Sequence, residues 1–333
     1  LALDPTGMGP RAEAVLAPPL RARAAASAAL SLTEATAELN RRHVVDLPDP
    51  RDLDAVIGLG GGYLRSADPA HELIFRAHHL PQLRLIERAG PRGAYLPVSV
   101  GPFRRGLGRD VRRRLGAAAW VAVRDDRSAR YLTGHANRHR FPDLAACHLG
   151  RARPEPQSGE PGVVGVALRS LQHSDLGPQV VDLLTERGCK LRYGVQSSSG
   201  RTNDDRSFYR DQGWSGDQED FGVLLDTDPR PSVVLAGRLH AALAAIAAGY
   251  PTVHLGYERK SAGAFADLGL DGYLVDAWAG EPSAVADLVM GLADDPEPYW
   301  ERLSERFDPL ADAWAELGRR VADVAEGSGR RGR

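Results

Sequence analysis

Lysine is nearly absent from this chain of 333 residues: only Lys190 and Lys260 occur, and all other cationic side chains are arginines. Together with abundant alanine, glycine and proline, this bias is typical of a high-GC genome, so most arginines need no functional interpretation. The 42 basic side chains face 44 acidic ones, which gives a formal net charge of −2. A chain without a clustered basic excess is not a dedicated nucleic-acid binder. A hydrophobic content of 43% also excludes wholesale disorder.

Cysteine is equally scarce, and long apolar runs are missing. Cys147 and Cys189 are too few for a disulfide framework, and no Cys-x-x-Cys pair is present to hold zinc. His71, Glu72, His78 and His79 lack the i, i+4 spacing of a zinc helix, and no metal is expected. No apolar run approaches the roughly 18 residues that span a bilayer, and no signal peptide is recognisable. The sequence therefore predicts a protein that has no transmembrane segment. The expected location is the cytoplasm, where the inner face of the membrane is one place that it could occupy.

Short β-branched runs alternate with longer helix-prone segments along most of the chain. This alternation predicts βαβ units, parallel sheets and an α/β fold. The second half also has clear helical spacing at 241–248 and 285–292. The expected strands are 55–59, 94–100, 118–123, 163–168, 191–195, 233–236 and 252–255.

One stretch, RARPEPQSGEPG at 151–162, has three prolines, two glycines and no apolar run, and we expect it to be an interdomain linker. It separates two expected Rossmann-like domains, at 1–150 and 163–325, each of ordinary domain size. Residues 326–333 are expected to be a disordered tail. Two such domains facing each other would form a central cleft at the carboxyl ends of their strands, where ligands bind in sheets of this kind.

A glycine cluster follows the first expected strand: Gly60, Gly61 and Gly62. It is not a dinucleotide fingerprint, because the third glycine of G-x-G-x-x-G would fall on Tyr63. Consecutive glycines let backbone N–H groups approach an anion or a sugar closely, but they also form tight turns without any ligand. Both interpretations stay open.

Arg124 and Asp125 follow the expected strand at 118–123. Asp125 is placed to cap the next helix, which is a structural role. Arg124, at the end of a strand, is placed to point into the expected cleft. Both residues are therefore candidates for the cleft lining.

The second half contains a stronger anion-site pattern. Arg169 directly follows the strand at 163–168, and Arg238, Leu239 and His240 open the helix after the strand at 233–236. The N-terminus of a helix offers free N–H groups and the positive end of its dipole to an anion. His240 is a candidate general acid or base, because imidazole titrates near physiological pH. A structural histidine beside an apolar helix is the alternative.

Glu258 and Lys260 follow the strand at 252–255 and are expected at the same edge. Lysine is a compact point charge that suits phosphate or carboxylate and is not interchangeable with arginine. Its presence here, in a chain that otherwise uses arginine, favours a binding role over a chance occurrence.

Taken in order, these segments resemble the polysaccharide pyruvyl transferase family. The resemblance covers roughly residues 54–275, and the Arg-Leu-His triplet and the glycine/lysine segment are its best markers. The matching pieces are IGLGGGYL at 57–64, SVGPF at 99–103, VRDDRSARYL at 123–132, PDLA at 142–145, VGVALR at 164–169, the loop with Asp204 and Asp205, GRLHAAL at 237–243 and GYERKSAGAFADLGL at 256–270.

The resemblance implies a transferase with a GT-B-like fold. Such an enzyme moves the enolpyruvyl group of phosphoenolpyruvate onto two hydroxyls of a sugar, forming a pyruvate ketal during polysaccharide biosynthesis. It implies that the C-terminal domain binds the donor, through Arg169, Arg238, the Leu239 backbone and Lys260, with His240 as the catalytic acid/base. The N-terminal domain would bind the acceptor, a glycan or lipid-linked sugar. No cofactor besides the donor is implied.

The chain departs from the family pattern in places that concern the acceptor side. The Asn…Gly-Asp-Glu pattern usual near the N-terminus is not recognisable, and Ser66 stands where an acidic residue is frequent. The frequent Tyr-Asp-x-Lys is Tyr257-Glu258-Arg259-Lys260. Two alternatives remain: a GT-B glycosyltransferase that uses a nucleotide sugar, with Glu258 on the ribose, and a non-catalytic sugar-binding protein.

Overall fold

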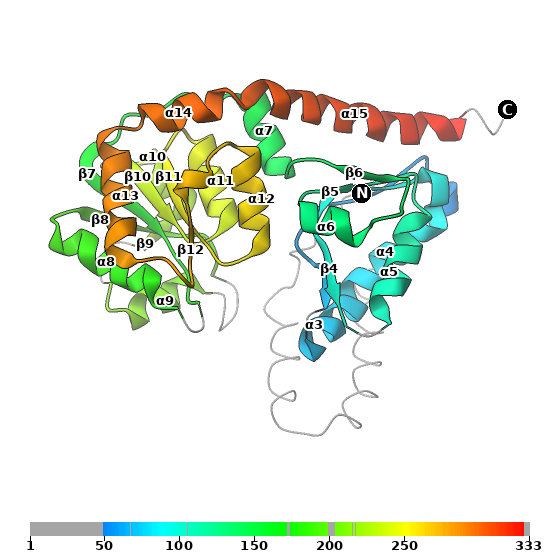
Figure 1. The fold of residues 1–333 in the computed structure, drawn as a ribbon, viewed down its shortest axis with the longest axis horizontal. Helices are drawn as coiled ribbons and strands as arrows, with labels where there is room; N and C mark the ends of the chain where they lie inside the picture. The colour runs from blue at the N-terminus through cyan, green and yellow to red at the C-terminus, as the bar shows by residue number, and fades with distance from the viewer. Residues whose placement is uncertain are drawn as a thin grey trace. The chain divides into compact units, whose positions relative to one another are not determined.

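The computed structural model describes residues 49–66, 68–104, 106–171, 174–198, 204–214, 216 and 218–329. The chain divides into two compact units, which are drawn in Figure 1. Unit 1 comprises Leu1–Leu144 and Ala315–Arg333, and unit 2 comprises Ala145–Trp314. The helix-prone region at 11–40 lies outside the described residues.

Unit 1 contains a four-stranded parallel sheet in the order β1-β3-β5-β6. Its strands are β1 (Val56–Gly58), β3 (Gly93–Val98), β5 (Trp120–Val123) and β6 (Arg138–Arg140). The expected strand at 94–100 is divided: β3 ends at Val98, and β4 (Val100–Phe103) pairs instead with β2 (Leu64–Ser66). Ser99, between them, is buried and turns its hydroxyl to a polar network, which ends the apolar pattern.

Helices of unit 1 bury apolar stripes against these strands. Leu83 and Ile86 of α4 and Val111 and Leu115 of α5 are buried in one core cluster with Tyr95 of β3. The helical segments are η2 (Pro50–Asp52), α3 (Pro69–Ile74), η3 (Phe75–His79), α4 (Leu80–Ala89), η4 (Gly90–Arg92), α5 (Leu107–Gly116) and α6 (Asp126–Tyr131).

Unit 2 is built on a six-stranded parallel sheet in the order β12-β11-β10-β7-β8-β9. The four strands expected from the sequence are confirmed as β7, β8, β10 and β11. The two outermost strands, of three residues each, have no apolar run long enough to predict them. The strands are β7 (Glu160–Ala167), β8 (Lys190–Val195), β9 (Gln218–Asp220), β10 (Pro231–Ala236), β11 (Thr252–Gly256) and β12 (Leu274–Asp276).

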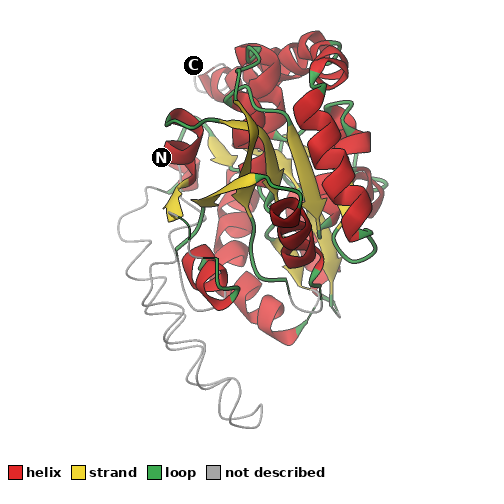
Figure 2. Ribbon diagram, turned by 90° about the vertical axis from the view of Figure 1, so that its left-hand side faces the viewer, coloured by secondary structure: helices red, strands yellow, loops and turns green. Residues whose placement is uncertain are grey.

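Helices cover both faces of this sheet, as Figure 2 shows. Because parallel crossovers are right-handed, the reversal of strand order after β9 puts α8 on one face and α10 and α11 on the other. The helix after the last strand, α13, packs against α8. The helices of unit 2 are α7 (Leu144–Ala152), α8 (Leu176–Glu186), α9 (Asp205–Asp211), α10 (Phe221–Asp226), α11 (Leu239–Ala247), α12 (Arg259–Asp267), η5 (Asp271–Tyr273), α13 (Pro282–Asp294) and α14 (Glu297–Ser304). The last helix, α15 (Phe307–Gly329), begins in unit 2 and belongs to unit 1 from Ala315 onward.

The boundaries of the units differ from the expected domains. The proline-rich stretch is not a free linker: its start belongs to α7, its end to β7, and the N–H of Gln157 donates to the carbonyl of Gly249 within unit 2 at 2.9 Å. Gly159 lies so close to the Pro231 carbonyl that a Cβ would approach it to 2.1 Å. Proline and glycine here serve close packing. The expected disordered tail from Glu326 is also different, because α15 continues through Gly329.

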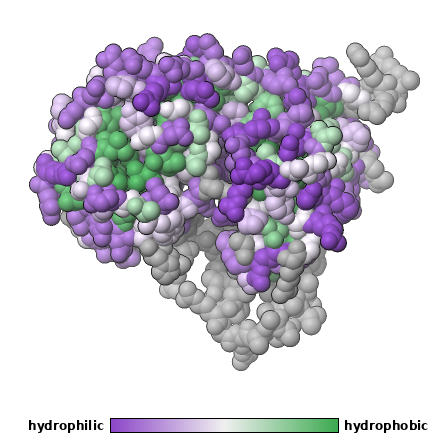
Figure 3. All heavy atoms as spheres, viewed as in Figure 1, coloured by the Kyte–Doolittle hydropathy of each residue, from purple (hydrophilic) through white to green (hydrophobic). Residues whose placement is uncertain are grey.

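The surface is largely polar. Figure 3 shows hydrophilic residues over most of the visible face, with apolar residues gathered over part of unit 2. Among the described residues, Trp278 and Val223 are the large apolar side chains most exposed to solvent. None of the helices in this part of the chain combines the length and the apolar composition needed to cross a bilayer. The same residues contain no group of three or more His, Cys, Asp or Glu side chains placed to hold a metal ion.

Candidate functional site

The candidate site lies in unit 2, where β7, β10 and β11 end. These strands are adjacent and parallel, and Ala236, the last residue of β10, pairs with Ala167 on one side and His254 on the other. The N–H of Gly237 donates to the Ala167 carbonyl at 2.8 Å. The segments after these strands therefore emerge at one edge of the sheet, as the sequence predicts. The chain places three cationic residues shortly after these strand ends: Arg169 after β7, Arg238 after β10 and Lys260 after β11.

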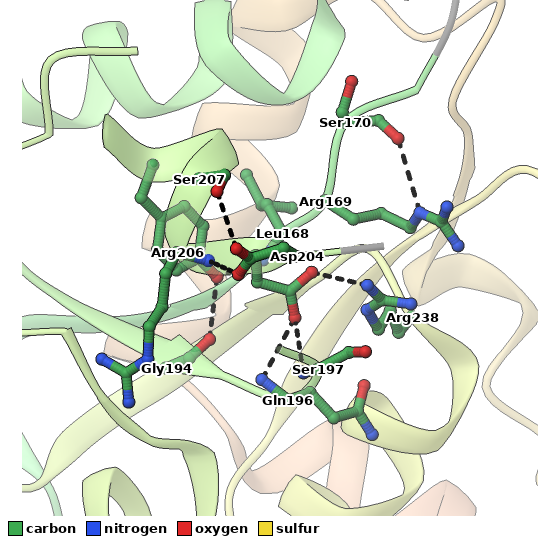
Figure 4. Close-up of polar contacts among 12 residues, drawn as sticks. Leu168, Arg169, Ser170, Gly194, Gln196, Ser197, Asp204, Arg206, Ser207 and Arg238 are labelled. Carbon is green, nitrogen blue, oxygen red and sulfur yellow. Dashed lines mark hydrogen bonds and ion pairs between the residues drawn. The ribbon is translucent and has the colours of Figure 1, made fainter. Parts of the chain in front are cut away.

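Arg169 is half-buried and lies against Tyr257. Its Nη1 donates to the Tyr257 hydroxyl at 3.2 Å, and its Cζ lies 5.4 Å from the centroid of that ring, which is cation–π distance. Its Nε contacts the Ser170 carbonyl at 3.4 Å, as drawn in Figure 4. Among the described residues, no carboxylate forms an ion pair with this guanidinium. Its charge is therefore oriented by a neutral ring.

Arg238 is held by a buried carboxylate. Its Nη2 donates to Oδ1 of Asp205 at 2.5 Å, and the two side chains are 13% and 2% exposed. The other carboxylate oxygen of Asp205 accepts from the N–H groups of Gln196 and Ser197, at 3.1 and 2.9 Å. Figure 4 shows Arg238 beside these two residues. Sequence reasoning placed Asp205 only in a polar loop and assigned it no partner.

Leu239 and His240 begin α11 behind Arg238, which caps that helix in an extended conformation. Leu239 is buried in the core, and most of the helix after His240 is buried too. His240 itself is exposed. It therefore does not belong to the core, and it lies in the N-terminal turn of α11, next to the arginine that precedes the helix.

Glu258 and Lys260 form an ion pair, with Nζ and Oε2 2.7 Å apart and side chains 20% and 23% exposed. Glu258 precedes the first residue of α12, and its carbonyl accepts from the N–H of Ser261 at 3.0 Å. The two residues that the sequence places at one edge are thus brought into contact. Lys260 shares its charge with a carboxylate that a bound anion would have to displace or adjoin.

Two buried polar side chains brace the strand ends beneath the site. The Tyr209 hydroxyl accepts from the N–H of Leu168 at 3.0 Å and donates to the Gly194 carbonyl at 2.8 Å, and burial raises its pKa well above the ordinary value. His254 joins the Ala236 carbonyl through Nδ1 and the Ser261 hydroxyl through Nε2, both at 2.8 Å. Since a carbonyl only accepts, Nδ1 carries the proton. Sequence reasoning did not single out His254; the signal that could have found it is a histidine inside an apolar strand.

We predict that His254 makes unit 2 sensitive to mild acid. Burial lowers its pKa from about 6.5 to about 4. Between these pH values His254 is therefore protonated in the unfolded chain and neutral in the folded protein. The stability is fully present above about pH 6.5 and is lost as the pH falls towards 4, by about 3 kcal/mol in total. Chemical denaturation between these pH values should show this loss in the wild type and not in His254→Asn. If the free energy of unfolding changes equally with pH in both proteins, His254 is not the source of the acid sensitivity.

The glycine cluster of unit 1 is explained by close packing. A Cβ on Gly60 would lie 1.9 Å from the Pro97 carbonyl oxygen, and one on Gly58 would meet the Tyr95 ring at 2.7 Å. The carbonyl of Gly61 accepts from the N–H of Ser99 at 2.9 Å. These contacts favour the tight-turn interpretation for Gly60 and Gly61. Gly62 is half-buried in the same segment.

Gly60→Ala should destabilise unit 1 by about 2 kcal/mol or more, because the added methyl group can be accommodated only by moving backbone. Gly106→Ala is the matched control: nothing lies within 4 Å of its Cβ and its φ is −73°, so it should be neutral or slightly stabilising. Urea denaturation measures both. A Gly60→Ala protein as stable as the control would show that the turn is loosely packed.

Arg124 and Asp125 lie inside unit 1, at 5% and 4% exposure. Arg124 forms a buried ion pair with Asp143, and its Nε donates to the Ser99 hydroxyl at 3.0 Å. Asp125 caps α6 by accepting from the N–H of Ser128 at 2.7 Å and also accepts from the Ser99 hydroxyl at 2.7 Å. The expected lining role is thus replaced by a structural one. The capping role is confirmed.

Arg124 and Asp125 are internal because polar groups at the end of β5 satisfy each other's charges and hydrogen bonds. The guanidinium donates to the Ser99 hydroxyl and to the carboxylate of Asp143, which lies 44 positions after Ser99 in sequence. The Ser99 hydroxyl in turn donates to the carboxylate of Asp125, which also accepts from the Ser128 hydroxyl. Such a network joins β5, α6 and the segment before α7. Buried polar groups are tolerated because they satisfy each other.

No protein-family model matches this chain, and no curated protein matches it. Among solved structures, it is similar to a chain in the crystal structure of accessory secretory protein 1, 2 and 3 in Streptococcus pneumoniae, with 13% sequence identity and a TM-score of 0.43. The alignment covers 90% of this chain and 58% of that chain. This chain therefore spans less than two thirds of the length of that structure's chain.

Proposed function

We propose that this protein is a pyruvyl transferase that moves the enolpyruvyl group of phosphoenolpyruvate onto two hydroxyls of a sugar. In this proposal the two units are Rossmann-like domains of a GT-B-like enzyme, and unit 2 binds the donor. The observation that supports it best is the meeting of Arg169, Arg238 and Lys260 at one edge of the unit 2 sheet, beside an exposed His240.

The charge of the cluster suits a small polyanion. Three cations are accompanied by the carboxylates of Asp205 and Glu258, which leaves an excess of one positive charge before any ligand binds. A phosphate and a carboxylate are each recognised well by the planar fork of an arginine. We assign these two groups of the donor to Arg169 and Arg238, assisted by the backbone at Leu239, with Lys260 as a further point charge.

His240 would supply the proton transfer. Protonation of the donor's methylene carbon produces an oxocarbenium-like centre at the neighbouring carbon, and a sugar hydroxyl attacks that centre as it loses its proton. A second hydroxyl then takes the place of phosphate, so the ketal and inorganic phosphate are the products. A positioned acid/base of this kind contributes about 10²- to 10⁴-fold in rate. The acceptor glycan, lipid-linked or free, would be held by unit 1.

The proposal is tested by thermal shift with two classes of donor. Phosphoenolpyruvate at 100 times its Kd should raise the melting temperature by about 5 °C, because it binds the folded protein only. Arg169→Ala should abolish the shift, whereas Arg88→Ala, at an exposed arginine of unit 1, should preserve it. A shift with nucleotide sugars alone would overturn the proposal in favour of a glycosyltransferase.

A further inference from the structure

Asp205 is the best anchored carboxylate at the edge of the unit 2 sheet. It is the first residue of α9, and its own N–H donates to the Ser197 carbonyl at 2.9 Å. Its Oδ2 accepts from two further backbone N–H groups, those of Gln196 and Ser197. These contacts fix the carboxylate to the end of β8 independently of any arginine. Oδ1 then presents a fixed acceptor to Nη2 of Arg238.

We propose that Asp205 is a positioning residue, which orients the guanidinium of Arg238 for one anionic group of the donor; this role rests on the proposed function. An arginine side chain has many rotamers, and bidentate recognition requires one orientation of its planar fork. Asp205 and Arg238 are 33 positions apart in sequence, and both side chains are largely buried. A buried ion pair adds little net stability, whereas it fixes a geometry.

The sign of the effect separates positioning from simple electrostatics. Removal of a carboxylate makes the site more positive, so Coulomb attraction alone would tighten the binding of every small anion. Loss of orientation acts differently. It leaves inorganic phosphate, a compact anion, as well bound as before or better, but it weakens a donor whose phosphate and carboxylate must meet two arginines at once.

The test is titration calorimetry of Asp205→Asn with phosphoenolpyruvate and with inorganic phosphate. We expect the preference of the wild type for phosphoenolpyruvate, expressed as the ratio of the two Kd values, to fall about tenfold, with phosphate bound at least as tightly as before. An unchanged ratio overturns the role of Asp205. Equal weakening of both anions also overturns it, because general damage to the fold does that. Wild-type protein that binds neither anion overturns the proposed function, and this role with it.

Three further variants define the effect. Asp204→Asn alters the neighbouring cap of α9, which accepts from the Arg206 N–H and the Ser207 hydroxyl, and should leave the ratio unchanged. In an Arg238→Lys background, Asp205→Asn should have no further effect on the ratio, since the fork that it orients is gone. If Asp205→Asn does not fold, as judged by circular dichroism, Asp205→Glu replaces it: the displaced carboxylate should lower the ratio, and an unchanged ratio overturns the role.

Discussion

His240→Gln should lower the release of phosphate from phosphoenolpyruvate by at least about 100-fold in the presence of an acceptor glycan. Glutamine keeps hydrogen-bonding capacity at the exposed first turn of α11 but cannot take up or release a proton at neutral pH. Because Leu239 and the rest of the buried face anchor the helix, the substitution should leave the fold intact. Initial rates of phosphate release measure the effect.

Donor binding is the control for this variant. His240→Gln should bind phosphoenolpyruvate within about threefold of the wild type, since the arginines remain and little transition-state interaction is realised in the ground state. His148→Gln, at an exposed histidine of α7 whose ring packs against Trp314 of α15, should keep full turnover. Retained turnover in His240→Gln would remove this histidine from the catalytic role.

Arg124→Met should destabilise unit 1 by about 3–5 kcal/mol, which is the largest stability effect that we expect. The substitution leaves the carboxylate of Asp143 buried, at 5% exposure, without its cation. It also removes the donor to the Ser99 hydroxyl, which itself donates to the buried carboxylate of Asp125. Arg76→Met is the matched control: its partner Glu72 is four residues away on a surface helix, and Arg76 is 52% exposed, so its loss should be worth about 0.5 kcal/mol or less.

Guanidinium denaturation followed by a probe in unit 1 distinguishes these two variants. Trp120 lies in that unit, buried at the start of β5 with its indole N–H donating to the Arg320 carbonyl at 3.2 Å. Its fluorescence should report a lower transition midpoint in Arg124→Met. Equal midpoints in both variants would mean that the network contributes no more than an exposed ion pair.

Much of the fold follows from hydrophobic pattern. The central strands β7 and β10 contain buried runs of Val, Leu, Gly and Ala, at 163–167 and 233–236, which is what a parallel sheet between two helical layers requires. The positions of Arg169, Gly237 and Lys260 at strand ends then follow from chain order alone. β9 and β12 lie at the edges of the sheet, where three residues suffice and no apolar run is needed.

Partners that are distant in sequence could not be predicted in the same way. Nothing in the local sequence around Asp205 distinguishes it from Asp204, yet one binds Arg238 and the other caps a short helix. Arg124 reads as an arginine at a strand end, and only its contacts with Ser99 and Asp143 show that it is internal. The glycine and proline content of 151–162 predicts a flexible linker. In the structure, the segment packs closely within unit 2, and this packing explains its composition better.

Ketal formation itself is the most direct test of the account. The protein should be incubated with phosphoenolpyruvate and a panel of oligosaccharides and then analysed by mass spectrometry, with phosphate measured in parallel. We expect one glycan to gain the mass of pyruvic acid less one water, with one phosphate released for each ketal formed, and neither product with His240→Gln. A glycan that instead gains a hexose from a nucleotide sugar, with no change from phosphoenolpyruvate, would contradict pyruvyl transfer.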